Sequence, residues 1–430
     1  MKIQNVRGSY DYLPKEQRIR NYIIDILKET FKSFGYQNIE TPILCYYDML
    51  SDKYDEENDI LKEIYRLTDQ GNRDLGLRYD LTVPFAKFIA LNKNKITFPF
   101  KRYEINKVFR DGPIKKGRDR EFTQCDCDIV GISGQLVEAE LLDLYVKVFK
   151  KLDIDIIIKY NSRKLMTGLI IESGIDISKV GIVTTIIDKK DKLSITEFNE
   201  CLMNIGLNDK QINNLNNYFE FSLDKLNQEF INPNNYLKEG LEELNNLNNY
   251  IMALNIDNIC LFDITLARGQ NYYTGNVFEV YEKNKIITCS IGGGGRYDNM
   301  ITEFISDGNI YPTVGISFGL SSIYELIKDR RLFDNEIDIY IIPMNTDIES
   351  IKLASMLRDL NYKVEIEMNN RKLKKSLDFA NKANIPYVII LGSDEVDNNI
   401  FKLKDMKECL EYEISMNTVE KIKEIVKIRE

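Results

Sequence analysis

Apolar side chains near the start of the chain recur at the spacing of an amphipathic helix. They stand three or four positions apart between residues 16 and 35, and Gly35 marks the end of the pattern. A short apolar run at 39–44 follows and predicts a strand. Pro42 lies inside this run and lacks a backbone N–H, so we place it at a strand edge or at a kink.

The middle of the chain changes from a strand pattern to a helix pattern. Short apolar runs alternate with charged turns over 75–130, which predicts several strands, two of them within 109–122 and joined by a loop. A helix is expected at 138–152. Residues 160–255 are rich in Asn and have helical spacing, so we expect an inserted helical subdomain there.

Strand patterns return after this insertion. We expect strands at 261–267, 276–281 and 286–291, followed by four consecutive glycines at 292–295. Over 336–430 strands and helices alternate and end in a helix at 417–429, which predicts a compact α/β domain with a mostly parallel sheet. The charged stretch 329–335 has no periodicity and is expected to be a linker.

Composition narrows the range of functions. The 430 residues include 58 basic and 67 acidic side chains, a net charge of −9, which argues against a general polyanion binder but leaves room for a local basic groove. No run of about 18 apolar residues occurs, and the N-terminus lacks the hydrophobic segment of a secretion signal, so we expect no membrane span. Seven scattered cysteines favour a reducing compartment, and we expect a cytoplasmic protein.

The chain contains no histidine at all, and this excludes whole classes of active site. Ser-His-Asp and Cys-His arrangements, HExxH metal sites and an imidazole general base are all impossible. Cys125 and Cys127 form the only close cysteine pair, and no second pair completes a zinc site, so we assign no metal-binding residues. Any chemistry has to rely on carboxylates, Arg, Lys, Tyr, Cys, a metal held by oxygen ligands or groups of the substrate.

A basic segment at 101–120 is the strongest local feature. Eight basic side chains stand there against three acidic ones, which makes a candidate phosphate-binding surface, although a solvated hairpin rim would have the same composition. Phe109 and Phe122 flank the loop, so Arg110 is expected near a strand end that can hold its guanidinium rigidly. The basic residues are Lys101, Arg102, Lys107, Arg110, Lys115, Lys116, Arg118 and Arg120.

Two further segments place polar side chains close together. Asp80 and Thr82 follow Arg78 and could bind an ammonium group, although a buried ion pair would have the same residues. Gln124 and Asp128 lie at even spacing on the strand after the basic loop, so their side chains share one face. A polar face inside a sheet has to meet solvent or a ligand, and we favour a ligand.

The segment 268–273 offers a cation and two phenols in one turn. Arg268, Tyr272 and Tyr273 could bind a small polar ligand together, although tyrosines more often belong to the core or its rim. The glycines at 292–295 lack the pattern of a phosphate-binding loop. They indicate a close approach of the backbone to a neighbouring strand or to a bound ring.

Taken in order, these segments resemble class II aminoacyl-tRNA synthetases, and specifically the histidyl-tRNA synthetase family, over nearly the whole chain. The matching segments are the family's opening at 7–14, motif 1 at 35–42, the amino-acid-binding strand at 77–84, motif 2 with its loop at 109–128, and the histidine-specific signature at 266–275. Motif 1 is the dimer-forming segment of the family. The signature joined to motif 2 is highly specific.

The resemblance implies an α+β catalytic core over 1–328, built on an antiparallel sheet with helices and carrying the helical insertion at about 160–255. It implies that 336–430 binds the anticodon. The implied activity is to join L-histidine to ATP as an adenylate and to transfer it to the 3′ end of tRNA(His). The implied state is a homodimer, with Mg²⁺ accompanying ATP.

The resemblance also assigns roles to individual residues. For histidine, Asp80 and Thr82 would receive the α-ammonium group, Gln124 and Arg268 the carboxylate, and Asp128, Tyr272 and Tyr273 the imidazole nitrogens. Leu81, between Asp80 and Thr82, would also belong to the histidine-binding residues. For ATP, Arg110 would bind the α-phosphate, Arg118 the distal phosphates, and Phe122 would stack on adenine. Arg110 and Arg268 would be the catalytic residues, and the glycines would form the pocket floor.

Two departures from the family pattern stand out. Motif 3 reads 315–322 and ends in Ser322 where the family has an arginine that stacks on ATP, a loss that Arg118 or Arg296 would have to offset. The signature has Gln270 and Asn271 where Leu-Asp is commoner. These departures keep open a synthetase-like regulatory subunit of histidine biosynthesis, although such relatives generally lack the anticodon domain. A non-catalytic tRNA-binding scaffold is the third alternative.

Overall fold

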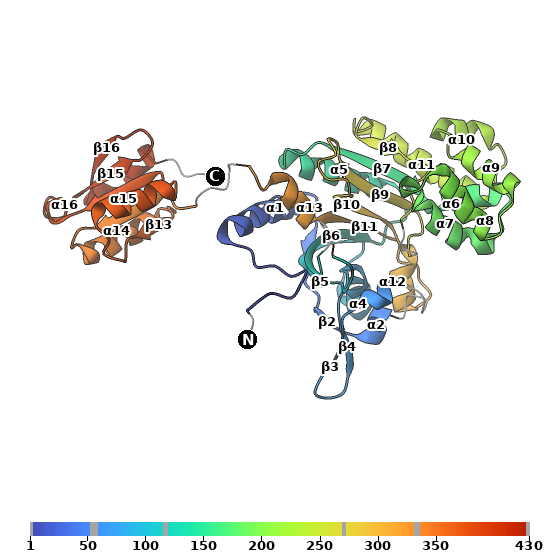
Figure 1. Cartoon of the computed structure of the whole chain (residues 1–430), viewed down its shortest axis with the longest axis horizontal. Coiled ribbons are helices and arrows are strands. Elements are labelled where there is room, and N and C mark those ends of the chain that lie inside the picture. Colours follow the sequence, from blue (N-terminus) through green and yellow to red (C-terminus); the bar gives the residue numbers. More distant parts are fainter. Residues whose placement is uncertain (1–2, 52–58, 115–118, 269–271, 331–335, 427–430) are drawn as a thin grey trace. The chain divides into compact units, whose positions relative to one another are not determined.

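The computed structural model describes residues 3–51, 59–114, 119–268, 272–330 and 336–426. The chain divides into two compact units, Met1–Tyr12 with Ile19–Lys328, and Leu13–Arg18 with Asp329–Glu430. Each unit has its own sheet (Figure 1). Of the helices in the described ranges, none combines the length and the apolarity that a membrane span requires.

The first unit is built on an eight-stranded sheet in the order β1-β5-β6-β11-β10-β9-β7-β8. Neighbouring strands are antiparallel, except that β1 pairs with β5 and β7 with β8 in parallel. The strands are β1 (Gln37–Asn38), β5 (Phe100–Phe109), β6 (Glu121–Val130), β7 (Ile156–Ser162), β8 (Cys260–Phe262), β9 (Asn276–Glu282), β10 (Gly292–Arg296) and β11 (Thr313–Gly319). The predicted antiparallel core is therefore confirmed.

Helices and a small sheet complete this unit. Helix α1 buries Ile19, Ile23, Leu27 and Phe31 at helical spacing, as the sequence pattern predicted. The helices are α1 (Pro14–Ser33), α2 (Tyr47–Ser51), α3 (Asp59–Glu63), α4 (Thr82–Asn92), α5 (Leu136–Lys151), α12 (Asp298–Ile305) and α13 (Leu320–Ile327), with a 3-10 turn at Lys93–Lys95. The small sheet has the order β2 (Leu44–Tyr46), β4 (Asp74–Leu77) and β3 (Arg66–Thr68).

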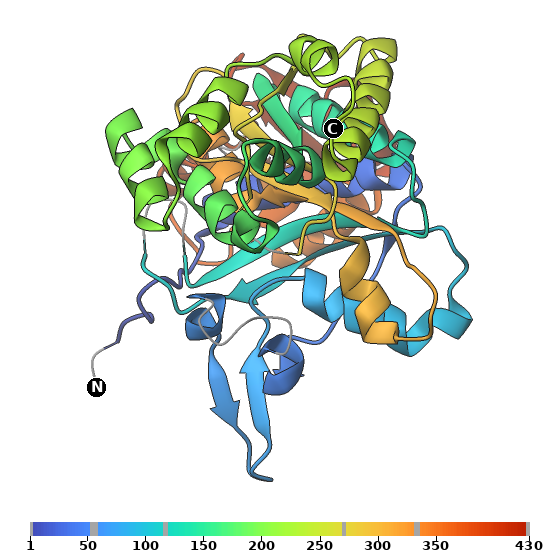
Figure 2. The same cartoon turned by 90° about the vertical axis from the view of Figure 1, so that its right-hand side faces the viewer.

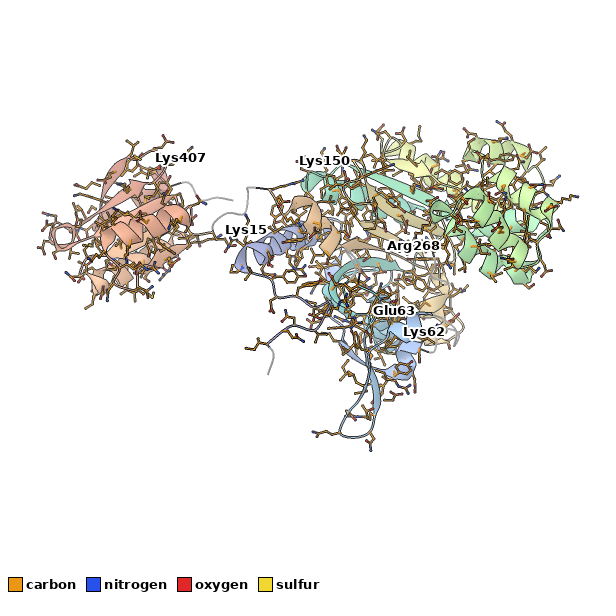
Figure 3. The ribbon with its side chains drawn as sticks, in the orientation of Figure 1. Lys15, Lys62, Glu63, Lys150, Arg268 and Lys407 are labelled. Carbon is orange, nitrogen blue, oxygen red and sulfur yellow. The ribbon has the colours of Figure 1, made fainter. Side chains whose placement is uncertain are left out.

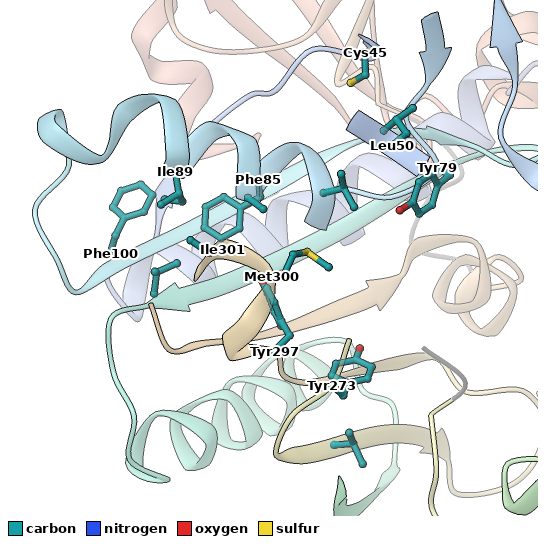
Figure 4. Packing of buried hydrophobic residues seen from close by; sticks show 14 of the residues in the cluster. Cys45, Leu50, Tyr79, Phe85, Ile89, Phe100, Tyr273, Tyr297, Met300 and Ile301 are labelled. Atoms are coloured by element: carbon teal, nitrogen blue, oxygen red, sulfur yellow. The ribbon is translucent and has the colours of Figure 1, made fainter. Parts of the chain in front are cut away.

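A buried cluster joins α4 to α12. Figure 2 shows α4 in light blue beside α12 in orange. Phe85 and Ile89 of α4 pack there with Met300 and Ile301 of α12, and Tyr273 and Tyr297 belong to the same cluster (Figure 4). Apolar packing therefore fixes the backbone from which these two tyrosines extend.

The helical insertion packs against the β7 end of the sheet (Figure 1). It consists of α6 (Arg163–Glu172), α7 (Val180–Ile187), α8 (Ile195–Asn204), α9 (Asp209–Tyr218), α10 (Leu223–Glu229) and α11 (Asn235–Ala253), with 3-10 turns at Ile177–Lys179 and Lys190–Lys192. Gly168 and Gly240 bring α6 and α11 into backbone contact: a Cβ at Gly168 would lie 2.4 Å from the backbone nitrogen of Leu237. Only glycine permits this approach.

The second unit has a five-stranded sheet in the order β13-β12-β14-β15-β16. The strands β12 (Ile339–Pro343), β13 (Val364–Ile366) and β14 (Tyr387–Leu391) are parallel, while β15 (Ile400–Asp405) and β16 (Glu411–Ser415) are antiparallel. The helices are α14 (Asp347–Asp359), α15 (Leu373–Lys382), α16 (Ser393–Asp397) and a 3-10 segment, Met416–Glu424. Within the described part of the helix expected at 417–429, the chain forms this 3-10 segment with a non-helical backbone at Thr418, so the prediction is wrong in type there; residues 427–429 lie outside the described residues.

Two other predicted strands are wrong, each for a local reason. Of the strand expected at 39–44 only Leu44 lies in a strand, β2, while β1 ends before this range. Between them Thr41 turns inward and donates to Glu104 through both its backbone N–H and its hydroxyl. No strand forms over 286–291, because the carboxylate of Glu282 accepts the backbone N–H groups of Asn284 and Ile286 and closes a turn. The sequence also missed α4 within 75–130.

The strand expected at 261–267 is shorter than predicted. It ends at Phe262, where Asp263 accepts the backbone N–H of Thr265 and begins a turn. The glycines at 292–295, by contrast, do form a strand, which pairs with β9 on one side and with β11 on the other. The glycine strand therefore lies inside the sheet rather than in a loop.

Candidate active site

A cavity of about 260 Å³ opens over the central strands of the large sheet. Side chains of β6 and backbone of β10 and β11 line it, together with the first turn of α4 and the segment before β9. Among the lining residues are Asp80, Thr82, Arg110, Phe122, Gln124, Asp128, Arg268, Tyr272 and Tyr273. The structure thus brings together in one cavity nine of the residues singled out from the sequence.

Two of the candidate residues are not part of this group. Leu81 is fully buried and does not line the cavity; its backbone oxygen accepts a hydrogen bond from Arg102 at 3.4 Å. Arg118 lies outside the described residues, as do Gln270 and Asn271 of the signature.

Glycines leave the space that charged side chains occupy on the cavity floor. A Cβ at Gly293 would lie 1.8 Å from Nη1 of Arg268, and a Cβ at Gly315 would lie 1.8 Å from Oδ1 of Asp128. A Cβ at Gly294 would likewise lie 2.1 Å from the backbone oxygen of Gly315. The glycine strand therefore approaches a neighbouring strand, which is one of the two alternatives from the sequence, and it also approaches a functional side chain, which the sequence did not predict.

Asp80 provides a buried acidic group at the start of α4. Burial raises its pKa to about 6, although the backbone N–H of Val83 and the charge of Arg110 act in the opposite direction. The Val83 N–H donates to Oδ1 at 3.1 Å, and Oδ2 has no hydrogen-bond partner in the part of the chain that the structure describes. An oxygen of this kind is suited to accept an ammonium group.

Asp128 is held by two other buried side chains. Nη2 of Arg102 lies 2.7 Å from Oδ2, as an ion pair rather than an aligned hydrogen bond, and the hydroxyl of Tyr297 donates to Oδ1. Both charged side chains are at most 5% exposed. Burial raises the pKa of Asp128, and Arg102 opposes this shift.

Arg110 and Phe122 form the basic end of the cavity. Nε of Arg110 donates to the backbone oxygen of Tyr79 at 3.0 Å, and its guanidinium lies 5.1 Å from the centre of the Phe122 ring. These contacts hold a cation against an aromatic face, where a phosphate and a flat base can both bind.

Arg268 lies beside the strands of the large sheet (Figure 3). Its Nη1 donates to the backbone oxygen of Phe278 at 3.0 Å and lies 3.7 Å from a carboxylate oxygen of Glu279. Burial disfavours its charge, but the nearby oxygens of Tyr273 and Glu279 outweigh this effect and raise the pKa of Arg268. The site therefore contains a permanently charged, positioned cation.

Arg296 does not offset the missing arginine at Ser322. It is buried, its Nε pairs with Glu138 at 2.7 Å, and its Nη1 donates to the backbone oxygen of Ile132. Ser322 lines the cavity, whereas Arg296 does not. Arg296 thus stabilises the fold instead of facing a ligand.

Among the cavity residues that sequence reasoning missed are Asp126 and Tyr297. Asp126 lies between Gln124 and Asp128 on the same face of β6, so the alternation that identified its neighbours could have identified it as well. Tyr297 follows the glycine strand directly, and its ring packs edge-on against Tyr272 at 5.9 Å. Its position shortly after the four glycines at 292–295 was the available signal.

The histidyl-tRNA synthetase family model matches residues 8–323, which include every element of the cavity. The chain belongs to the histidyl-tRNA synthetase family. The model of the anticodon-binding domain matches residues 338–425. Among curated members of the family, the chain is 43% identical to histidine–tRNA ligase 1 of Bacillus cereus, covering 97% of this chain and 99% of the relative. It is 41% identical to histidine–tRNA ligase 2 of Shouchella clausii, covering 96% and 98%.

Solved structures of family members have the same fold. Histidyl-tRNA synthetase from Nostoc sp. PCC 7120 superposes with a TM-score of 0.86 at 27% identity, covering 99% of this chain and all of that chain. Apo histidyl-tRNA synthetase from S. aureus gives a TM-score of 0.72 at 22% identity, covering 97% and 99%. The predicted class II synthetase fold is confirmed.

Proposed function

We propose that this member of the histidyl-tRNA synthetase family is an active histidine–tRNA ligase. It joins L-histidine to ATP as histidyl-adenylate and transfers the histidyl group to tRNA(His). The observation that carries the proposal is the single cavity in which acidic, amide and phenol groups meet two arginines, Arg110 and Arg268. The family membership of the whole chain supports the same activity.

Histidine binds at the end of the cavity where Asp80 and β6 meet. Asp80 and Thr82 receive the α-ammonium group, because an unpartnered carboxylate oxygen is available there. Gln124 and Arg268 hold the carboxylate. Asp128, Tyr272 and Tyr273 surround the imidazole, and their mixture of acceptors and donors suits its two different nitrogens.

ATP binds at the basic end. Phe122 stacks on adenine, Arg110 contacts the α-phosphate and Arg118 the distal phosphates. Mg²⁺ is part of the nucleotide substrate, since it is usually bound through phosphate oxygens and several waters.

Adenylate formation follows from positioning and charge. The carboxylate of histidine attacks the α-phosphorus, and the bond from this phosphorus to the bridging oxygen breaks so that pyrophosphate leaves. The step therefore requires no side-chain nucleophile and no base. Negative charge develops on the phosphate oxygens, and the guanidinium groups of Arg110 and Arg268 stabilise it. In the transfer step a terminal ribose hydroxyl of tRNA attacks the histidyl carbonyl carbon, and the bond to the adenylate phosphate breaks. AMP leaves, and its phosphate oxygen takes the proton of the hydroxyl. A chain without histidine can therefore perform both steps.

We infer that the second unit recognises the anticodon and that the enzyme is a cytoplasmic homodimer that acts on tRNA(His). The match of 338–425 to the anticodon-binding domain supports the first inference. Exposed apolar side chains beside motif 1, at Ile43, Leu44 and Tyr46, support the second, since burying them against another copy is favourable. The described cysteines are all free, as expected in a reducing compartment.

Histidine-dependent exchange between ATP and labelled pyrophosphate tests the proposal. The purified protein should exchange label with histidine and not with the other amino acids, and it should charge tRNA(His). Ser322 makes a regulatory subunit the alternative, because that position provides no cation for ATP. Histidine binding without pyrophosphate exchange would favour the regulatory subunit. Binding of tRNA without histidine binding and without pyrophosphate exchange would favour a non-catalytic scaffold.

A further inference from the structure

Arg268 lies at one end of a row of alternating charges that crosses the large sheet. Gly293 on β10, Glu279 on β9 and Lys159 on β7 are direct neighbours in the strand register. The guanidinium of Arg268 occupies the space above Gly293, and the ammonium group of Lys159 donates to Asp263, directly after the edge strand β8, at 2.6 Å. We call Arg268, Glu279, Lys159 and Asp263 the charge row.

Glu279 contacts Arg268 with one carboxylate oxygen and is itself held through the other. Its Oε1 lies 3.7 Å from Nη1 of Arg268. Its Oε2 accepts a hydrogen bond from the hydroxyl of Tyr281, which lies two residues further along the same face of β9. Gly293 offers no side chain that could hold Arg268 in place, so polar contacts have to orient the guanidinium.

Tyr281 is restrained by the far end of the charge row. Nζ of Lys159 lies 5.6 Å from the centre of the Tyr281 ring, and its pairing with Asp263 fixes the ammonium group there. Asp263 also accepts the backbone N–H and the hydroxyl of Thr265, which anchors this end. Burial raises the pKa of Tyr281, and the negative charge of Glu279 raises it further, so the hydroxyl keeps its proton and remains a donor.

Glu279 and Tyr281 are not among the residues that line the cavity over the central strands. They line a separate small cavity of about 60 Å³, together with Lys159 and Asp263. The two cavities share none of the residues that the structure describes. Arg268 lines the larger cavity, so Glu279 and Tyr281 can influence the reacting groups only through this arginine.

We propose that Glu279, Tyr281 and Lys159 are positioning residues that hold Arg268 in the orientation in which it stabilises the α-phosphate. A cation that is oriented before the reaction needs no rearrangement when negative charge develops on the phosphate oxygens. The inference rests on the proposed function. It adds three residues to which the resemblance assigned no role.

A double-mutant cycle between Glu279→Gln and Arg268→Ala tests the proposal. Glu279→Gln keeps the shape of the side chain and removes its charge. With Arg268 present, it should lower the single-turnover rate of adenylate formation by about 10-fold and leave the KM for ATP within about threefold of the wild-type value. In the Arg268→Ala background it should change the rate by less than about twofold, because the cation that it orients is absent. A residue that merely supports the fold would lower the rate equally in both backgrounds.

A second variant and a rescue experiment strengthen the test. Tyr281→Phe removes only the hydroxyl that holds Glu279, and it takes the place of Glu279→Gln if that variant does not fold. It should lower the rate by about threefold with Arg268 present and have no effect in Arg268→Ala. Added guanidinium ion should restore part of the rate of Arg268→Ala, and this rescue should be about 10-fold weaker when Glu279→Gln is also present.

The control and the contrary outcomes separate this inference from the proposed function. Glu200→Gln, at an exposed position on α8, is the matched control and should react like wild type. A wild-type enzyme without any histidine-dependent exchange would contradict the proposed function. An active wild type in which Glu279→Gln and Tyr281→Phe change the rate by the same factor with and without Arg268, or do not change it at all, would overturn only the positioning role.

Discussion

At the scale of single residues, the buried charged groups of the site differ in whether an oppositely charged side chain pairs with them. Arg78 pairs with Glu104 at 3.0 Å, and Arg102 pairs with Asp128 at 2.7 Å, so these arginines are neutralised inside the protein. Asp126 has no such dedicated partner. A charge that is buried without compensation lowers the stability of the empty protein, and this cost is measurable.

The pH dependence of stability should reveal Asp126. Its folded pKa is about 7, whereas an unfolded aspartate titrates near about 3.9. The folded state therefore holds this proton more tightly, and the contribution of Asp126 to stability is lost as the pH rises from about 4 to about 7. Asp126→Asn removes the charge without changing the shape. It should raise the free energy of unfolding by up to about 4 kcal/mol at pH 8, and the gain should shrink by about 1.4 kcal/mol per unit below pH 7.

Urea denaturation of the ligand-free protein at pH 8 and pH 5.5 measures this difference. Asp257→Asn, at an exposed position, is the matched control and should change neither value. An Asp126→Asn gain of equal size at both pH values would show that another group titrates.

Arg268 should contribute mainly to the chemical step. It is positioned by Phe278 and Glu279, and its interaction with the α-phosphate strengthens as charge develops there. Arg268→Ala should reduce the rate of adenylate formation by about 10²–10³-fold, the effect of losing one preorganised donor, with a smaller loss in histidine affinity. Single-turnover kinetics separate the two effects. Arg66→Ala, which removes an exposed ion pair with Asp74, should behave like wild type. A near-normal rate in Arg268→Ala would remove this residue from the mechanism.

At the scale of elements, the strand β10 depends on the four glycines at 292–295, which have no side chains. Its backbone is paired on both sides, while Arg268 occupies the space above Gly293. Sheets usually lose stability through internal glycines, so this strand relies on its neighbours to fill the volume.

Gly293→Ala should therefore act on catalysis through geometry. The new methyl group would lie 1.8 Å from Nη1 of Arg268 and has to displace it. We expect kcat to fall by about 10²-fold, close to the effect of Arg268→Ala. Gly181→Ala in α7 has no atom within 4 Å of the added Cβ and should leave activity unchanged while stabilising the helix by about 0.5–1 kcal/mol. Equal activity of Gly293→Ala and wild type would show that Arg268 adjusts without loss.

Periodic segments could be predicted from the sequence, and contacts between distant side chains could not. The helix at 16–35 is observed as α1, because four apolar residues at helical spacing define a buried face. The apolar run at 286–291 was wrongly predicted to be a strand, because the turn that forms there depends on the carboxylate of Glu282. Alternation placed Gln124 and Asp128 on one face. The sequence pattern did not show that Asp128 contacts Arg102 on β5 and Tyr297 after β10, because these residues are far apart in the chain.

At the scale of the whole molecule, the two units should contribute separable activities. Deleting residues 330–430 removes the sheet of the second unit and leaves the cavity residues in place. Pyrophosphate exchange should stay detectable, while the KM for tRNA should rise. Phosphate contacts weaken with salt, so the difference between the full-length and truncated proteins should shrink as salt increases. Equal charging by both proteins at limiting tRNA and low salt would argue against a role in tRNA binding.

The absence of histidine from the whole chain allows a prediction about its synthesis. Codon drift towards A and T is one explanation, and the many Asn, Ile and Lys residues are consistent with it. A second explanation is that an enzyme without histidine can still be translated when charged tRNA(His) is scarce. Counting histidines in the other synthetases of the same genome distinguishes the two, since equal absence there would leave drift as the cause. Otherwise, histidine codons at the exposed positions Asn213 and Asn246 should slow recovery from histidine starvation without changing the purified enzyme.

The glycine floor limits how the substrate range of this enzyme can change. Residues 292–294 and Gly315 are already the smallest that a chain can carry, so substitution can only fill this side of the cavity and never enlarge it. Room for a bulkier amino acid would have to come from the walls formed by Tyr272, Tyr273 and Tyr297. Redesign towards unnatural histidine analogues, and inhibitors that exploit extra bulk, should therefore be directed at the tyrosine side of the ring.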